Sequence, residues 1–335
     1  MTPPTTWADL AWLTALAALT AYLLLGGADF GGGVWDLLAT GEDAQAQRRA
    51  VAEAMGPVWE ANHVWLIFLL ILLFTAFPPF FHALVTDLYV PLNLILLGII
   101  LRGAAFVFRS RAPAGVGPRS TWGAVFGAAS TLALLLLGAA VGAVTKGGPL
   151  GVPQRSWLSP VALATGLFAV AAAAYLSAVY LTLETRGTLQ ATFRRRARWA
   201  ALALALAGSL ELALLHAEAL RFWSRLASPG ILGVALLTVA LGAASYACLT
   251  AHRDALARGL GAAAVGLLLW GWAAAQWPYI AYPGFPVRAA AAPSLPLRET
   301  LLVAVLGLVV LVPSLWLLFH VFKGGAPRRT PRPSR

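Results

Sequence analysis

The sequence predicts an all-α, polytopic membrane protein with nine transmembrane helices, and three observations support this fold class. Of the 335 residues, 60% are hydrophobic and only 11% are charged, and the mean hydropathy is +0.78. A soluble domain carries about 25% charged residues, so the composition excludes a soluble enzyme, a disordered chain and a disulfide scaffold. The third observation is that long apolar stretches recur along the whole chain.

A hydrocarbon core about 30 Å thick requires about 20 apolar residues per helix. Nine segments meet this requirement: 10–38, 57–77, 83–107, 121–145, 159–183, 199–217, 229–251, 259–278 and 299–322. The first is interrupted by two glycines and an aspartate at 26–29, and Pro78 and Pro79 should end the second. We expect residues 1–324 to form a single integral membrane domain and the basic tail 325–335 to be disordered.

The basic residues indicate how the helices are oriented. With the N-terminus outside, 17 of the 24 lysines and arginines fall in inside segments, six fall in outside loops, and Arg102 lies within a span. Basic residues accumulate on the cytoplasmic side, so the N-terminus is predicted outside and the C-terminus inside. The net charge of +11 is then loop charge and not a sign of nucleic-acid binding. No basic residue precedes Arg48, so we expect the first span to be retained and not cleaved as a signal peptide.

The first polar cluster is GGADFGGGVWD at 26–36. A charge at mid-bilayer costs about 2.5–3.5 kcal/mol, so Asp29 is expected to face protein or water and to have a role. Gly27 and Gly31 have the G-x-x-x-G spacing that lets a second helix approach closely. Asp36 lies seven residues from Asp29 on the same helical face. The functional interpretation is a protonatable carboxylate in a tight bundle. The alternative is that Asp29 only caps a broken helix and Asp36 is interfacial.

The second cluster, GPVWEANHVWLI at 56–67, opens the second predicted span, and its proline suits a first helical turn. Glu60 and His63 are i, i+3 neighbours that can share a proton, and Asn62 lies between them. An acidic first turn that complements the helix dipole is the alternative, and it explains Glu60 but neither Asn62 nor His63. Two tryptophans stand where an aromatic belt is expected: Trp59 and Trp65.

Other polar residues are weaker candidates. Arg102 is expected to pair with a carboxylate of the same bundle. The remainder lie within or at the ends of predicted spans: Asp87, Asn93, Glu184, Glu211, His216, Glu218, Gln276 and Glu299. With five histidines, two methionines and no histidine pair spaced to hold stacked haems, the chain has no convincing haem ligands. No metal-binding, P-loop or dinucleotide motif is present.

Four segments carry a family resemblance: GADFGGG at 27–33, PVWEANHVWLI at 57–67, LRGAAFVFRSR at 101–111 and the closing helix at 294–324. Together they resemble subunit II of the cytochrome bd quinol oxidases. The resemblance implies nine helices in two bundles plus one peripheral helix. The family's intramembrane residues fall here on Asp29, Trp59, Glu60, Asn62 and Arg102. The chain departs from the family pattern at Gly26, where relatives often carry a second acid, at Ala28 in place of phenylalanine, and at Glu60, one methylene longer than aspartate.

The resemblance also implies an activity and partners. Such oxidases lie in the prokaryotic plasma membrane and couple quinol oxidation to the reduction of oxygen to water. Haem b and haem d belong to the partner, subunit I. Subunit II stabilises that partner and contributes a cytoplasmic proton path, and in some members it holds a structural quinone. Lipid and a small accessory subunit are further expected partners.

Our mechanistic hypothesis joins Asp29, Glu60 and His63 with water in one inside-facing chain. Desolvation disfavours the charged form of a lone buried carboxylate, so such a group can accept and release protons. Two alternatives remain open from the residues. A proton-coupled secondary transporter would also place carboxylates in glycine-broken helices, and a purely structural subunit would leave proton traffic to its partner.

Overall fold

The computed structural model describes residues 6–111, 118–151 and 156–324. Its elements, in chain order, are α1 (Trp7–Leu37), α2 (Ala44–Ala76), α3 (Pro78–Asp87), α4 (Tyr89–Arg111), α5 (Pro118–Lys146), the 3-10 helix η1 (Ser156–Leu158), α6 (Pro160–Glu184), α7 (Gly187–Glu218), α8 (Leu220–Leu226), α9 (Pro229–Thr250), α10 (Asp254–Gln276), β1 (Tyr279–Ala281), β2 (Phe285–Pro286) and α11 (Ser294–Gly324). The predicted tail 325–335 lies outside the described residues.

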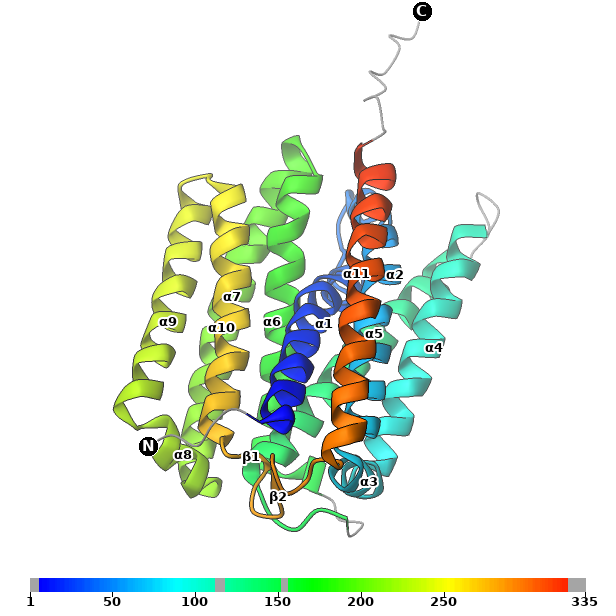
Figure 1. Cartoon of the computed structure of the whole chain (residues 1–335). Coiled ribbons are helices and arrows are strands. Elements are labelled where there is room, and N and C mark those ends of the chain that lie inside the picture. The colour runs from blue at the N-terminus through cyan, green and yellow to red at the C-terminus, as the bar shows by residue number, and fades with distance from the viewer. Residues whose placement is uncertain (1–5, 112–117, 152–155, 325–335) are drawn as a thin grey trace, which may run out of the picture.

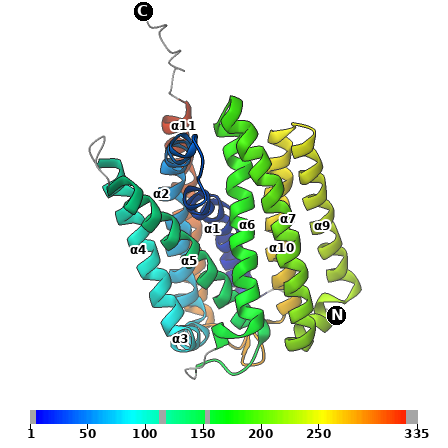
Figure 2. The same cartoon turned by 180° about the vertical axis from the view of Figure 1, so that it is seen from behind.

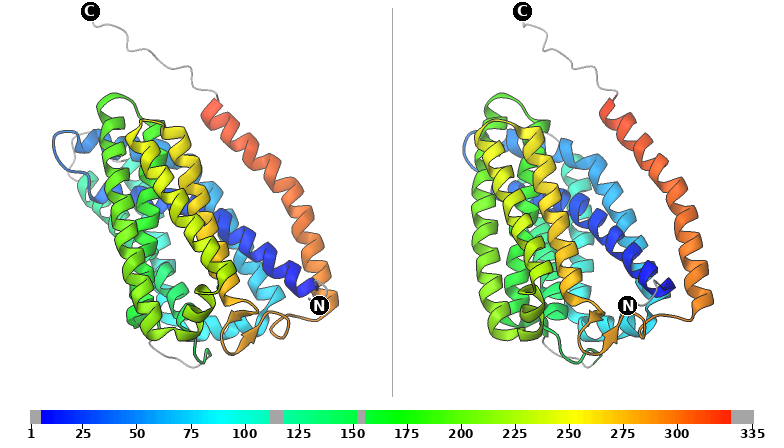
Figure 3. Two further views of the ribbon diagram at one scale, coloured as in Figure 1. Left: turned by 90° about the vertical axis from the view of Figure 1, so that its left-hand side faces the viewer. Right: turned by 60° about the vertical axis from the view of Figure 1, so that its left-hand side comes forward.

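The helices form two bundles and one peripheral helix, as predicted (Figure 1). The first bundle contains α1, α2, α4 and α5, and the second contains α6, α7, α9 and α10. Figure 2 shows α5 between α4 and α6, so α1 and α5 make the boundary with the second bundle. Helix α11 lies at the edge of the molecule and packs mainly on α2 and α1 (Figure 3). Within the described residues, eight helices are long and apolar enough to cross a membrane, and the bent α2–α3 pair gives up to nine.

Helix α1 is continuous, contrary to the predicted interruption at residues 26–29. Glycine inside a helix costs about 1 kcal/mol relative to alanine, but here the glycines let α1 contact its neighbours closely. A Cβ built on Gly31 would lie 2.0 Å from the carbonyl oxygen of Ala173 in α6, and one on Gly33 would lie 2.3 Å from Cβ of Ser130 in α5. The predicted close helix approach is therefore confirmed, with α6 as the partner of Gly31.

Helix α2 begins at Ala44, thirteen residues before the predicted start at 57. The extension is a polar helix rather than a lipid-facing one: Arg49 Nε lies 2.7 Å from Glu53 Oε1 in an exposed i, i+4 ion pair. Hydropathy therefore missed it, and Pro57 lies within the helix instead of in its first turn. Helix α7 starts at Gly187, twelve residues before the predicted 199. Hydropathy missed this start because residues 194–198 contain four arginines.

The chain turns sharply after Ala76. The two prolines end α2 as predicted, and α3 leaves it at a bend of 116°. Residues 83–87 belong to α3, so the third crossing begins at Tyr89 and not at the predicted 83.

The segment between α10 and α11 contains a short antiparallel hairpin that the sequence did not predict. β1 pairs with β2 through Tyr279 opposite Pro286 and Ala281 opposite Phe285. Nearby, Arg288 binds Asp9 of α1 at 2.7 Å, and Asp9 also forms a capping box with Thr6. Helix α1 starts at this end of the bundles, and α11 finishes at the other end (Figure 1). The positions of these two helix ends agree with an odd number of crossings. Which end faces the cytoplasm stays a prediction.

Candidate functional site

The centre of the first bundle holds a buried ion pair between α1 and α4. Arg102 Nη2 lies 2.7 Å from Asp29 Oδ1, and both side chains are 2% exposed or less. Asn62 of α2 donates from Nδ2 to Asp29 Oδ2 at 2.7 Å. Arg102 Nε donates to Ser130 Oγ of α5 at 3.1 Å. Four helices thus converge on one carboxylate and one guanidinium, and the expectation that Arg102 pairs with a carboxylate is confirmed.

Aromatic rings complete the surroundings of this pair. The guanidinium carbon of Arg102 lies 4.1 Å from the ring centre of Phe30 and 5.4 Å from that of Phe126. A desolvated cation gains about 2 kcal/mol from such a ring. Burying an ion pair is costly unless its remaining polar atoms are also bonded. The amide, the hydroxyl and the rings together supply part of that compensation for Asp29 and Arg102.

A second ion pair lies two helical turns away. Arg109 Nη1 of α4 is 2.6 Å from Asp36 Oδ1 of α1. Asp29 and Asp36 are seven residues apart, and so are Arg102 and Arg109. The first acid pairs with the first arginine and the second with the second because α1 and α4 run in the same direction. The ring of Phe126 also lies 5.1 Å from the guanidinium carbon of Arg109. Two stacked acid–base pairs therefore join the same two helices.

Several buried polar atoms around these pairs have no partner among the described residues: Tyr22 Oη, Asp36 Oδ2, Asn62 Oδ1, Arg102 Nη1 and Arg109 Nη2. A cavity of about 10 Å³ adjoins the first pair and is lined by Asp29, Trp59, Arg102, Phe106 and Phe126. That volume is close to the lower limit for one water molecule. Because buried polar groups are nearly always hydrogen-bonded, the cavity and the unpartnered Nη1 of Arg102 fit one ordered water molecule.

The second predicted cluster divides between two places. Asn62 contacts Asp29, and Trp59 lines the small cavity. His63 is half-buried, and its Nδ1 lies 2.7 Å from the carbonyl oxygen of Trp59, so no described contact joins it to Asp29. Trp65 packs edge-on against Phe68 at 6.2 Å. The side chain of Glu60 lies outside the part of the chain that the structure describes.

The premise of a lone carboxylate is therefore wrong for Asp29, because a guanidinium and an amide bind its two oxygens. Sequence reasoning also missed Ser130, Phe126 and the pairing of Asp36 with Arg109. One signal was present: the seven-residue spacing of the two acids matches that of the two arginines, which is what two helices joined by two ion pairs require.

The weaker candidates lie outside this site. Thr165 Oγ1 of α6 lies 2.9 Å from Glu211 Oε1, which is half-buried on α7. Glu218 lies 3.1 Å from Lys146 Nζ near the hairpin end. Gln276 donates to the carbonyl oxygen of Val144 at 3.3 Å. These contacts join helices of the second bundle to α5 or α6 and do not reach Asp29.

Residues 7–322 match the family described as cytochrome bd terminal oxidase subunit II. The chain belongs to this family. Cytochrome bd-I ubiquinol oxidase subunit 2 of Escherichia coli K12 is 28% identical over 202 residues, which cover 57% of this chain and 52% of that protein. Cytochrome bd ubiquinol oxidase subunit 2 of Bacillus subtilis 168 is 33% identical over 101 residues, 30% and 29% of the two chains.

The matched part of this cytochrome bd subunit II chain thus spans about half of the Escherichia coli protein and less than a third of the Bacillus protein. The structure of the bd oxidase from Geobacillus thermodenitrificans superposes with a TM-score of 0.81 at 19% identity, covering 96% of this chain and 100% of that one. This similarity shows the fold. The chain is a multi-pass membrane protein of a known oxidase architecture.

The histidines of this subunit do not fit a haem site. A haem ligand directs a ring nitrogen into a cavity that holds the iron. His63 directs Nδ1 to a backbone carbonyl, and the other four are exposed on this chain: His82, His216, His252 and His320. Within the described ranges, no group of three or more histidines, cysteines or acids is placed to hold a metal ion.

Proposed function

We propose that this chain is the haem-free half of a cytochrome bd-type complex that oxidises quinol and reduces oxygen to water in a prokaryotic plasma membrane. The observation that carries this proposal is the family match over residues 7–322. The two relatives named as ubiquinol oxidase subunits agree with the substrate class. Electron transfer and oxygen chemistry then belong to a haem-bearing partner, subunit I, because the histidines of this chain do not fit that task.

Purification tests the partnership directly. The full chain is extracted with a mild detergent through an affinity tag, and the absorption spectrum of the product is recorded. We expect a second membrane subunit and b- and d-type haem bands in the same fraction. A colourless chain that is stable alone and carries a solute across vesicles would contradict the proposal and favour the transporter alternative.

We further propose that the first bundle conducts protons toward the partner. The route uses water beside the two ion pairs, from the Asp36–Arg109 pair near the predicted cytoplasmic end to Asp29 in the centre. Asp29 and Arg102 line the small cavity that fits water, and Nη1 of Arg102 has no hydrogen-bond partner among the described residues. Glu60 and His63, which flank Asn62 on α2, remain proposed members of the route. Protons then move along water molecules beside the Asp29–Arg102 pair, in place of transfer through a lone carboxylate.

The experiment measures oxygen consumption and haem spectra in the same membranes. Asp29→Asn keeps the side-chain volume but removes the charge and replaces one of the two acceptor oxygens by an NH2 group. We expect it to slow turnover at least tenfold with haem bands retained. Glu60→Gln should slow turnover less. Glu53→Gln, on the exposed turn of the same helix, is the matched control. Loss of the haem bands in Asp29→Asn would assign the pair to assembly, as the structural-subunit alternative requires, and unchanged turnover would exclude the proton route.

A further inference from the structure

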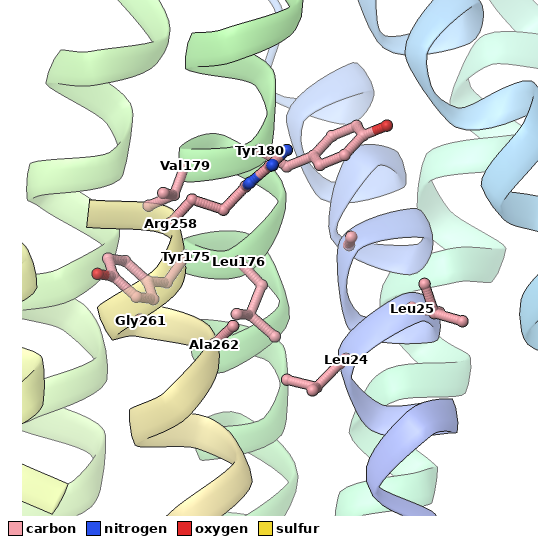
Figure 4. A pocket seen from close by; sticks show the side chains of 10 residues that line it. Leu24, Leu25, Tyr175, Leu176, Val179, Tyr180, Arg258, Gly261 and Ala262 are labelled. Carbon is pink, nitrogen blue, oxygen red and sulfur yellow. The ribbon is translucent and has the colours of Figure 1, made fainter. Parts of the chain in front are cut away.

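A separate cavity of about 240 Å³ lies between α1, α6 and α10, away from the ion pairs (Figure 4). It exists because α1 crosses α10 at an angle. The two helices touch at Thr20, which accepts a hydrogen bond from Trp270 Nε1 at 3.2 Å, and beyond that point α1 leans away. Small side chains on the helices beyond that contact leave the space unfilled: Ala28, Gly261 and Ala262.

The lining is almost entirely apolar. Leu24 of α1 and Leu176 of α6 point toward each other across the space, beside Ala262 of α10 (Figure 4). The hydroxyl of Tyr175, which also borders the cavity, is already hydrogen-bonded to Ser245 Oγ. Apolar cavities of this kind do not hold water and do bind hydrocarbon. Leu24, Ala262 and Arg258 are partly or fully exposed, so the cavity opens on the surface of the chain.

The charge at the mouth selects among apolar ligands. Arg258 extends along the opening toward Tyr180, with its guanidinium carbon 5.9 Å from that ring. It lies at the end of the bundle where residues 184–198 and 253–258 contain seven arginines and two acids. One of those acids, Asp254, is bound by Arg194, and the other is Glu184, which faces Arg258. The excess charge favours a ligand with an anionic head.

We infer that this cavity is a binding site for an anionic phospholipid, with one acyl chain between α1, α6 and α10 and the phosphate at Arg258. An acyl chain in the cavity gains van der Waals contacts with side chains that otherwise line an unfilled space. The arginine supplies the preference for an anionic head group near a membrane surface. The inference does not depend on the proposed proton route, since no residue is shared with it.

Native mass spectrometry of the full chain, purified with whatever copurifies, tests the inference. The probes are phosphatidylglycerol and phosphatidylcholine with identical acyl chains. We expect the wild type to retain one phosphatidylglycerol, and Ala262→Leu, which fills the cavity, to lose it. Arg258→Gln should weaken binding about fivefold while leaving phosphatidylcholine binding unchanged. Two matched controls should behave as the wild type: Ala263→Leu, exposed on the same helix, and Arg253→Gln, exposed at the same end.

Three results would overturn the inference. Equal binding of the two lipids in the wild type and in Arg258→Gln would make the contact unspecific. A retained quinone that Ala262→Leu removes would assign the cavity to a neutral ligand, and failure to retain any lipid would remove the site. If Ala262→Leu does not accumulate in membranes, Arg258→Gln still tests the inference, because the Arg258 side chain is exposed and its replacement should leave the fold intact.

Discussion

The two halves of the chain repeat one order of elements but hold their helices together differently. Each half has two long helices, one short helix and two more long helices: α1 to α5 and α6 to α10. In the first half, the first and fourth of these helices are joined by the ion pair of Asp29 and Arg102, supported by Ser130 of the fifth. In the second half, the corresponding helices α6 and α9 are joined by the hydroxyls of Tyr175 and Ser245, supported by α10.

This difference shows that buried charge is not a requirement of the fold. Ser245 Oγ donates to the carbonyl oxygen of Ala257 at 2.6 Å, so Tyr175 donates to Ser245 and the contact is complete without any ion. A neutral contact at the place of Asp29 would cost less desolvation. The charged contact is therefore the feature that a function must explain, and it lies where the proton route is proposed.

The largest effect should come from breaking the charged contact. Asp29→Ala leaves Arg102 buried without its counter-ion, which destabilises by about 3–5 kcal/mol. The double variant Asp29→Ala with Arg102→Leu should recover most of that loss, because neither charge remains. Thermal unfolding of the detergent-solubilised protein measures both. A double variant as unstable as the single one would mean that the geometry of the pair, and not its charge, supports the bundle.

The boundary between the halves gives the next largest effect. Gly31→Ala places a Cβ about where the Ala173 carbonyl oxygen stands, so α1 and α6 must separate, and overpacking of this kind costs about 1–3 kcal/mol. Gly230→Ala in α9 has no atom within 4 Å of the new Cβ and should instead stabilise by up to about 1 kcal/mol. Opposite signs in the same unfolding assay are expected. Equal shifts would contradict the close contact.

A smaller effect is expected from the neutral contact. Tyr175→Phe removes one hydrogen bond but leaves Ser245 bonded to Ala257, so the loss should be about 0.5–1.5 kcal/mol. Ser245→Ala is the reciprocal variant and should cost more, because it leaves the buried Tyr175 hydroxyl without a partner. A loss as large as that of Asp29→Ala would remove the distinction between the halves.

The smallest effect should come from the half-buried acid of the second half. Glu211→Gln keeps a carbonyl oxygen that can accept from Thr165 Oγ1, so stability and oxygen consumption should change little, within about 0.5 kcal/mol and twofold. A strong decrease in turnover would show that the second half also depends on a titrating group.

Hydropathy predicted the apolar crossing helices because it reflects contact with lipid, and it failed where a helix extends out of the lipid. The polar starts of α2 and α7 are helical but carry arginines, so their true beginnings at Ala44 and Gly187 were missed. The break expected at Gly26 and Gly27 did not occur, because glycines in a membrane helix serve close packing as readily as bending. The sequence pattern of α1 does not reveal which neighbouring helix packs against its glycines.

The candidate site was predicted in part for a related reason. Asp29, Asn62 and Arg102 stood out because a polar group in a span is costly and needs a partner. The supporting groups did not stand out: Ser130 and Phe126 are ordinary in a membrane helix until α1 and α4 are placed beside them. His63 was predicted to belong to the site because it lies next to Asn62 in the sequence, whereas its ring contacts the carbonyl oxygen of Trp59 in its own helix.

The contact between Gly31 and Ala173 has a consequence for exchanging parts between relatives. Here the two bundles meet backbone against backbone, with no flexible side chain to absorb a mismatch. A chimaera that joins one bundle to the second bundle of a distant relative would need a hydrogen atom at position 31 and a small residue at position 173. A chimaera without glycine at 31 and a small residue at 173 would force the two bundles apart, whether or not a partner subunit is present.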